Sequence, residues 1–348
     1  MNFSNTLIYW YLQNKRDLPW RKTKNPYLIW LSEIILQQTR VDQGLDYYLK
    51  FSHAFPTVFD LANAQENHIL NLWQGLGYYS RARNLHYSAK YIVNNLNGNF
   101  PKTYTELLSL KGVGDYTASA IASICFNEPT AVVDGNVYRV LARYFGIYTP
   151  INSTKGQKEF KKLAQDLIDS NNPGNHNQAI MEFGAKQCKP QNPVCTDCPL
   201  QNSCIALKNK TITRLPVKVN KTKVTKRYFN YLVINANQHT VLNRRATKGI
   251  WQNLYEFPLI ESNHEIDMVD LISHKTFQQL FSKNNTRVKL YNQTPILHKL
   301  SHQHLHTKFW IVTTTQLFDE SILWIDFEKF PVPILIHNFV TEFKSNKN

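Results

Sequence analysis

Glu33 stands out in the sequence because its position suits a general acid. It belongs to a predicted helix that starts after a capping Asn and a Pro, and its neighbours one turn away include Ile29 and Leu36. A carboxyl on an apolar helix face has a raised pKa and holds its proton near neutral pH. The alternative is a structural Glu that pairs with a buried Arg or an amide. The polar tip Gln37, Gln38 and Thr39, suited to reading base edges, favours the catalytic interpretation.

A second carboxylate, Asp134, directly precedes an apolar helical repeat. At a helix N-terminus, free amides and the helix dipole keep a carboxylate ionised. Twenty residues earlier, Gly112 and Gly114 form a Gly-Val-Gly turn between two predicted helices. Both glycines can adopt positive φ, and the amides that open the next helix attract an anion such as a DNA phosphate. Alone, each feature is commonly only a turn or an N-cap.

Four of the five cysteines lie close together, as Cys188, Cys195, Cys198 and Cys204, separated by six, two and five residues. Four thiolates in a short loop bind either a 4Fe–4S cluster or Zn²⁺, and the chemistry alone does not choose between them. The odd total of cysteines argues against a disulfide framework.

Length and charge set the wider frame. The chain has 348 residues and a net charge of +15, which favours a polyanionic partner. We predict three parts, which are a helical domain over 1–209, a basic linker over 210–227 and a mixed α+β domain over 228–348. No run of 18 apolar residues and no signal-peptide pattern occur, so we expect a cytoplasmic protein without a membrane span.

Two further stretches have the composition of DNA contacts. Arg16, Trp20 and Arg21 could stack a base and hold phosphate, although a Trp that anchors a loop to the core is an equal alternative. Gly75 and Gly77 bracket a tight turn that is followed by arginines, and we expect Leu76, Tyr78 and Tyr79 to project from it as a wedge that unstacks a duplex. The alternative is a turn between helices that is packed by its own aromatic side chains.

The sequence resembles the MutY-type adenine DNA glycosylases over nearly its whole length. The resemblance is strongest in LPWR, SEIILQQTRV, WQGLGYYSRARNL, LKGVGDYTA, VDGNVYRVLAR, the four cysteines and WQNLYEFP. It implies a mostly α helix-hairpin-helix glycosylase domain with a 4Fe–4S loop, followed by an α+β Nudix-like domain that recognises the lesion. It also implies a monomer that binds double-stranded DNA and removes adenine mispaired with 8-oxoguanine or guanine.

The resemblance also implies roles for individual residues. Glu33 would protonate the flipped adenine at N7, and Asp134 would stabilise the oxocarbenium-like sugar. Tyr116 and Asn136 would support these carboxylates, and Gln178 would contact the adenine edge. A protonated acid in an apolar site beside an ionised acid in a polar one also matches the chemistry of glycosidases.

For the mispair, the resemblance places Gln38 and Thr39 beside the lesion pair and makes Tyr78 the wedge. Ser301 and His302 would belong to the loop that contacts 8-oxoguanine. That loop starts with Phe in the family and with Leu in this chain. The spacing of the four cysteines matches the iron–sulfur loop of endonuclease-III-like glycosylases.

The sequence also bears on three alternative functions. An endonuclease-III-like lyase acting on oxidised pyrimidines needs a Lys where this chain has Tyr116, and Tyr138 replaces a Lys found in some adenine glycosylases. A non-enzymatic DNA-binding protein would tolerate Glu33→Gln. An active Nudix hydrolase needs a Glu-rich helix, and no such run follows Glu256.

Overall fold

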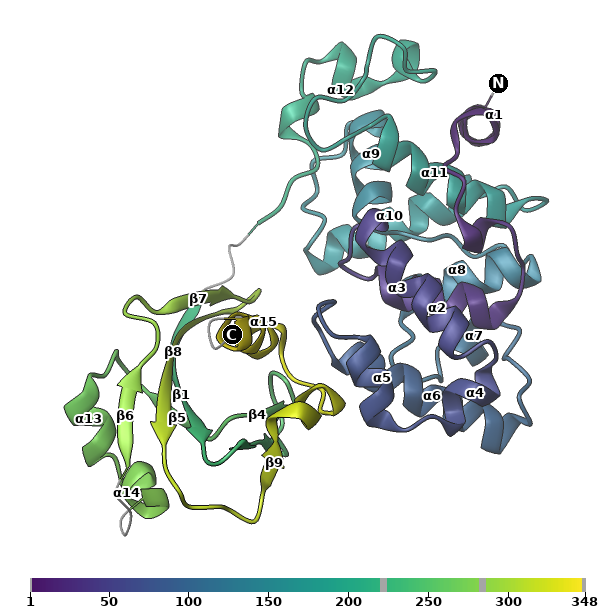
Figure 1. The fold of residues 1–348 in the computed structure, drawn as a ribbon. Coiled ribbons are helices and arrows are strands. Elements are labelled where there is room, and N and C mark those ends of the chain that lie inside the picture. Colours follow the sequence, from purple (N-terminus) through teal and green to yellow (C-terminus); the bar gives the residue numbers. More distant parts are fainter. Residues whose placement is uncertain (1, 220–223, 282–285, 346–348) are drawn as a thin grey trace. The chain divides into compact units, whose positions relative to one another are not determined.

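The chain is described here by a computed structural model over residues 2–219, 224–281 and 286–345 (Figure 1). Its contacts divide it into two compact units. The first unit joins residues 1–64 with 83–220, and the second joins residues 65–82 with 221–348. Residues 65–82 therefore pack with the unit that follows them far along the sequence. Part of the predicted linker, residues 220–223, lies outside the described residues.

The first unit is helical, and the turns between its helices are short. Among the described residues its α-helices are α1 (Phe3–Asn14), α2 (Pro26–Leu36), α3 (Val41–Ala54), α4 (Val58–Asn63), α6 (Ser80–Leu96, which starts in the second unit), α7 (Tyr104–Leu107), α8 (Asp115–Phe126), α9 (Gly135–Phe145), α10 (Thr154–Leu167), α11 (Pro173–Lys186) and α12 (Ile205–Lys208). Its 3-10 helices are η1 (Pro19–Arg21), η2 (Gln201–Ser203) and η3 (Ile212–Arg214).

Local sequence signals explain where the helices that carry the site begin. The Asn25 side chain accepts hydrogen bonds from the first amides of α2, and Pro26 occupies the first helical position. Gly112 has φ 84°, and a side chain there would meet Asn84. Gly114 instead has φ −100° and caps α8, so the expected positive φ is wrong for this residue. A Cβ at Gly114 would face open space, which leaves its backbone accessible.

The second unit is a mixed α+β domain with a strand pattern typical of neither a barrel nor an open parallel sheet. Its strands are β1 (Thr225–Asn235), β2 (His239–Val241), β3 (Asn243–Arg244), β4 (Tyr255–Glu256), β5 (Leu259–Ser262), β6 (Arg287–Leu290), β7 (Ile296–Lys299), β8 (Gln303–Thr313) and β9 (Ser321–Leu323). Its helices are α5 (Glu66–Leu72), α13 (Met268–Ser273), α14 (Lys275–Phe281), η4 (Trp324–Lys329) and α15 (Ile334–Ser345). Residue His274 alone separates α13 from α14.

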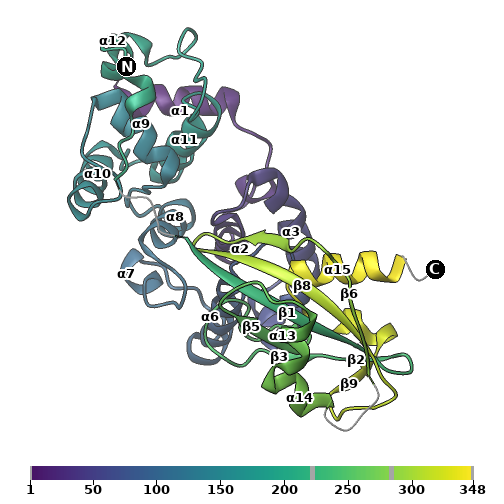
Figure 2. The same ribbon diagram turned by 90° about the vertical axis from the view of Figure 1, so that its left-hand side faces the viewer.

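The main sheet of the second unit has the order β5-β1-β8-β6, with β7 also paired to β8. Strands β1 and β8 run parallel, and the other pairs are antiparallel. Helices cover both faces of this sheet (Figures 1 and 2). Trp310 belongs to a buried cluster with residues of α13 and α14, whereas Phe309 stacks on Phe339 of α15 with ring centroids 3.9 Å apart. Because successive side chains of β8 point to opposite faces of the sheet, this strand contributes to the buried cluster on each face.

Polar contacts fasten α5 to the strands of the second unit. The Glu66 carboxylate accepts hydrogen bonds from Arg244 at 3.1 Å and from Asn253 at 2.8 Å. Gln74 donates to the carbonyl of Val332 at 3.0 Å. The described residues contain no helix that has both the length and the apolar character needed to cross a membrane.

Candidate active site

Glu33 and Asp134 line one cavity of the first unit. The cavity has a volume of about 600 Å³ and is formed mainly by α2, α8, α9 and α11 with the loop around η1. That volume lies within the range of about 300–1,000 Å³ that is usual for ligand pockets. The two carboxylates therefore share one space of the size that ligands usually occupy. Tyr116, Asn136 and Gln178 line the same cavity.

Glu33 is buried, with 8% of its surface exposed, on the apolar face of α2. Burial raises the pKa of this carboxyl to about 7, and the negative charge of Asp134 acts in the same direction. A hydrogen bond from the Tyr116 hydroxyl and the positive charge of Arg21 act against that rise. Glu33 therefore holds a proton at a pH at which an ordinary Glu is ionised, as the sequence predicts.

Asp134 is the N-cap of α9. Its Oδ1 accepts hydrogen bonds from the amides of Asn136 and Val137, both at 2.8 Å, and its Oδ2 accepts one from the Asn136 side chain at 2.8 Å. Burial raises the pKa of Asp134, and these donors only partly offset it. The sequence predicts the amide donors to Asp134, but it does not indicate that this carboxyl is buried. Arg139 donates to Asn136 Oδ1 at 2.8 Å and so fixes the side chain that holds Asp134.

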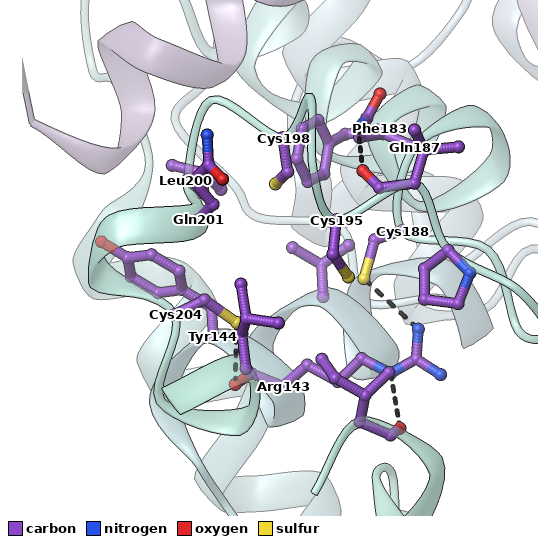
Figure 3. Close-up of a pocket in the computed structure, with 15 residues that line it drawn as sticks. Arg143, Tyr144, Phe183, Gln187, Cys188, Cys195, Cys198, Leu200, Gln201 and Cys204 are labelled. Carbon is purple, nitrogen blue, oxygen red and sulfur yellow. Dashed lines mark hydrogen bonds between the residues drawn. The ribbon is translucent and has the colours of Figure 1, made fainter. Parts of the chain in front are cut away.

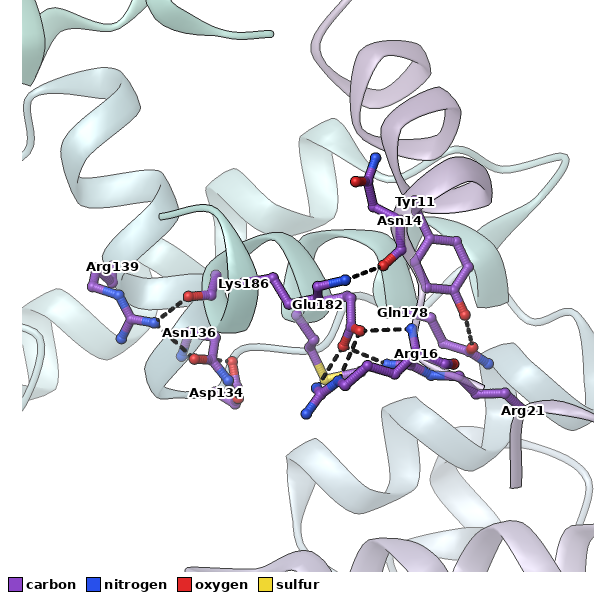
Figure 4. Close-up of polar contacts among 12 residues, drawn as sticks. Tyr11, Asn14, Arg16, Arg21, Asp134, Asn136, Arg139, Gln178, Glu182 and Lys186 are labelled. Atoms are coloured by element: carbon purple, nitrogen blue, oxygen red, sulfur yellow. Dashed lines mark hydrogen bonds and ion pairs between the residues drawn. The ribbon is translucent and has the colours of Figure 1, made fainter. Parts of the chain in front are cut away.

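A buried carboxylate on α11 organises the arginines at one wall of the cavity (Figure 4). Glu182 accepts hydrogen bonds from Arg16 at 2.6 Å and from Arg21 at 2.7 Å, and its own side chain is fully buried. Burial alone would raise the pKa of Glu182, but the hydrogen bonds from both arginines lower it to about 2. The sequence predicts that these arginines hold phosphate, whereas in the structure both are paired with Glu182.

Of the other residues of the first unit that the sequence predicts to contact DNA, one is buried in the core and two lie nearer the surface. Trp20 lines the cavity but is buried, with an edge contact to Tyr48 at 5.0 Å, as the loop-anchoring alternative requires. Gln38 is exposed and has φ 55°, and Thr39 lines the cavity beside it. The end of α2 thus presents polar groups at the cavity rim.

The predicted wedge and lesion loop meet within the second unit. The hydroxyls of Tyr78 and Ser301 are hydrogen bonded, and Ser301-His302 form the tip of the hairpin between β7 and β8. Tyr78 is 48% exposed and has φ 49°. Leu76 and Tyr79 are buried, so the prediction that they project beside Tyr78 is wrong. The glycine turn instead packs Leu76 inward and presents one aromatic side chain.

The four predicted metal ligands line a second, smaller cavity of the first unit (Figure 3). Arg143 holds their loop, because its guanidinium donates to the carbonyls of Lys189 at 2.7 Å, Pro190 at 3.1 Å and Leu215 at 3.1 Å. It also contacts Cys188 Sγ at 3.5 Å. In the part of the chain that the structure describes, no His, Cys, Asp or Glu group is arranged to hold a single metal ion. Four thiols around a shared cavity can hold either a 4Fe–4S cluster or Zn²⁺.

Glu256 of the second unit is not placed for metal binding. Glu256 is buried and accepts hydrogen bonds from Arg245 at 2.7 Å and from the Tyr231 hydroxyl at 3.0 Å. The chain continues from Glu256 into β5 rather than into a helix. This carboxylate is therefore part of a buried ion pair, which argues against pyrophosphate hydrolysis by this unit.

Comparison with known proteins agrees with this arrangement. Residues 31–168 match the family described as HhH-GPD superfamily base excision DNA repair protein, and residues 230–342 match the NUDIX domain. An adenine DNA glycosylase of Buchnera aphidicola subsp. Baizongia pistaciae is 38% identical over 319 residues, which cover 89% of this chain and 86% of that protein. The human adenine DNA glycosylase is 46% identical over 213 residues, covering 59% of this chain and 39% of that protein.

Solved structures show the same helical fold. A thermostable thymine-DNA glycosylase superposes with a TM-score of 0.55 at 30% identity and covers 60% of this chain and 95% of its own. Endonuclease III in a non-covalent DNA complex superposes with a TM-score of 0.52 at 22% identity, covering 60% and 94%. The fold and the paired carboxylates define a base-excision DNA glycosylase, whose partner is DNA. Within that class, the chain belongs to the adenine DNA glycosylases and removes adenine from DNA.

Sequence reasoning missed the side chains that hold the site in place. Glu182 is the one acid in the apolar part of α11, one turn after Gln178, and that isolation was a usable signal. Arg143 lies within an apolar repeat of α9 and is only 2% exposed, which its sequence position does not reveal. Tyr11 reads as an ordinary core residue of α1, although its hydroxyl contacts Gln178.

Proposed function

We propose that this enzyme hydrolyses the N-glycosidic bond of adenine opposite 8-oxoguanine or guanine in duplex DNA, acting as a monomer. The observation that carries the proposal is the single cavity lined by a carboxyl with a pKa of about 7, Glu33, and by a second carboxyl held by helix amides, Asp134. These are the two environments that cleavage of a glycosidic bond requires. A base inside a duplex can reach such a cavity only when it is flipped out.

The chemistry follows from the positions of the two acids. Glu33 donates its proton to adenine N7, and the electrons of the bond between C1′ and N9 move onto the leaving base. Asp134 stabilises the positive charge that develops on the sugar. Water then adds its oxygen to C1′, and its proton returns to the Glu33 carboxylate. Tyr116 hydrogen bonds to Glu33, and Asn136 holds Asp134, so both acids stay oriented during the reaction.

The cysteine loop fits a 4Fe–4S cluster, which Cys188, Cys195, Cys198 and Cys204 would hold. When bound, such a cluster supplies a rigid, thiolate-linked anchor for the loop. Arg143 holds the chain on both sides of that loop with or without this contribution.

The hairpin tip of the second unit supports recognition of the opposite base. Ser301 and Tyr78 present hydroxyls at one point of this unit, and Tyr78 is the exposed aromatic of the glycine turn. Ser301→Ala should reduce the preference for 8-oxoguanine over guanine opposite adenine. Ser273→Ala, on the exposed surface of α13, is the matched control and should leave the preference unchanged.

The proposal is tested by single-turnover assays on duplexes with adenine opposite 8-oxoguanine, guanine or thymine, and on a duplex with thymine glycol. We expect free adenine and an alkali-labile site from the first two duplexes. Glu33→Gln should still bind these duplexes but release at least about 100-fold less adenine, because only the proton donor is lost. Nicking at thymine glycol without alkali would instead favour the lyase alternative.

A further inference from the structure

Tyr11 is tied to the cavity although it does not line it. It lies on α1, 1% exposed, and its hydroxyl donates a hydrogen bond to Gln178 Oε1 at 2.5 Å (Figure 4). Gln178 lines the cavity that holds both carboxylates. Tyr11 therefore reaches the substrate space only through the amide of another residue.

The ring of Tyr11 is itself held by the arginine network. The Arg21 guanidinium lies 5.4 Å from the centre of the Tyr11 ring, and Arg21 is anchored by Glu182 at 2.7 Å. Glu182 and Gln178 are four residues apart on α11 and so share one face of this helix. The phenol and the amide are thus both fixed to the same helix face.

The direction of the hydrogen bond follows from the chemistry of the phenol. Burial raises the pKa of Tyr11, so its hydroxyl keeps the proton and has to place it on an acceptor. Gln178 Oε1 is an acceptor and Gln178 Nε2 is not. Reversing the amide would leave a buried O–H without an acceptor, which is unfavourable.

We propose that Tyr11 is a positioning residue that locks the Gln178 amide in the polarity that matches adenine and opposes 6-oxopurines. This inference rests on the proposed function of the cavity. With Oε1 turned to Tyr11, one lone pair of Oε1 remains for a donor on the base, and Nε2 offers its hydrogens to a ring nitrogen beside that donor.

Adenine presents this pattern on either edge, because its 6-amino donor stands next to the acceptors N1 and N7. Hypoxanthine has an oxygen at position 6, so this O6 atom would face the Oε1 atom of Gln178. Its N1–H and O6 fit only the reversed amide. A fixed Gln178 amide therefore distinguishes the 6-amino group of adenine from the N1–H group of hypoxanthine. A Gln side chain that rotates freely would accept both bases.

The test compares release of adenine and of hypoxanthine from otherwise identical duplexes by full-length wild type, Tyr11→Phe and Tyr9→Phe. Tyr11→Phe removes one oxygen and keeps the ring beside Arg21. We expect adenine release to fall about five- to tenfold, while hypoxanthine release is unchanged or faster, so that the ratio falls by at least the same factor. Tyr9, which is 56% exposed on the same helix, is the matched control and should leave the ratio unchanged.

A second variant separates positioning from general destabilisation. In a Gln178→Met background, Tyr11→Phe should change adenine release less than twofold, because the group through which it acts is gone. An equal loss on both bases, an unchanged ratio, or a full effect in the Met background would each overturn the inference. Wild type that releases no adenine would overturn the proposed function, and the inference with it.

Discussion

The protonation of Glu33 should govern the pH dependence of base release. Burial raises the pKa of this carboxyl to about 7, and only the protonated form can donate to the leaving base. One pH unit above that pKa about one-tenth of the enzyme keeps the proton, and two units above it about one-hundredth does. Adenine release should therefore be highest below pH 7 and fall about tenfold per pH unit above pH 8.

The assay measures adenine release between pH 5.5 and pH 9.5 with enzyme in excess over DNA but below saturation, because that rate reports the pKa of the free enzyme. DNA binding is measured at each pH, so that loss of binding is separated from loss of chemistry. A rate that stays constant up to pH 9, or that falls with a midpoint near pH 4.5, would refute the assignment of Glu33 as the acid.

Tyr116→Phe provides a directional check on the same reasoning. A side-chain interaction with Tyr116 lowers the pKa of the Glu33 carboxyl, so removing the Tyr116 hydroxyl should raise this pKa. The alkaline fall in rate should then move to higher pH even though the maximum rate is smaller. Movement to lower pH would show that the cause assigned to the shift is wrong.

Three further outcomes follow from the buried charges. Glu33→Gln should stabilise the protein at pH 8 by about 3 kcal/mol in urea unfolding and much less at pH 5, because a carboxyl with a raised pKa destabilises the fold as it ionises. Glu182→Gln should destabilise it by about 3 kcal/mol at pH 7, since two arginines lose their partner, and a change below about 0.5 kcal/mol would contradict the ion-pair network. Arg143→Met should make the cysteine loop sensitive to limited proteolysis and, in protein purified with iron, reduce visible absorbance, whereas unchanged cleavage and colour would show that Arg143 does not hold the loop.

The parts of the site that depend on local patterns could be predicted from the sequence. Glu33 on an apolar helix face and Asp134 before a helical repeat are visible because helical spacing and capping act within a few residues. The four cysteines are visible because their ligand spacing is short. The two carboxylates and the four cysteines lie in one unit because the same local signals predict a single helical domain that contains them all.

Long-range pairing could not be predicted in the same way. Arg16 and Arg21 look like free phosphate ligands in the sequence, but their partner Glu182 lies more than 160 positions away. Leu76 fails as a wedge for a related reason, because which face of the glycine turn is buried depends on packing within the second unit. Such outcomes are decided by tertiary contacts, which single-residue propensities do not encode.

The docking of α5 and the glycine turn through Glu66 and Gln74 affects how this enzyme can be dissected. A truncated protein ending at residue 209 would retain both acids and the cysteines, yet it would strip residues 65–82 of the strands against which they fold. Such a truncation therefore removes more than an accessory domain, because it also removes the packing partners of residues 65–82. The segment that it lacks also carries Ser301, whose hydroxyl is hydrogen bonded to that of Tyr78.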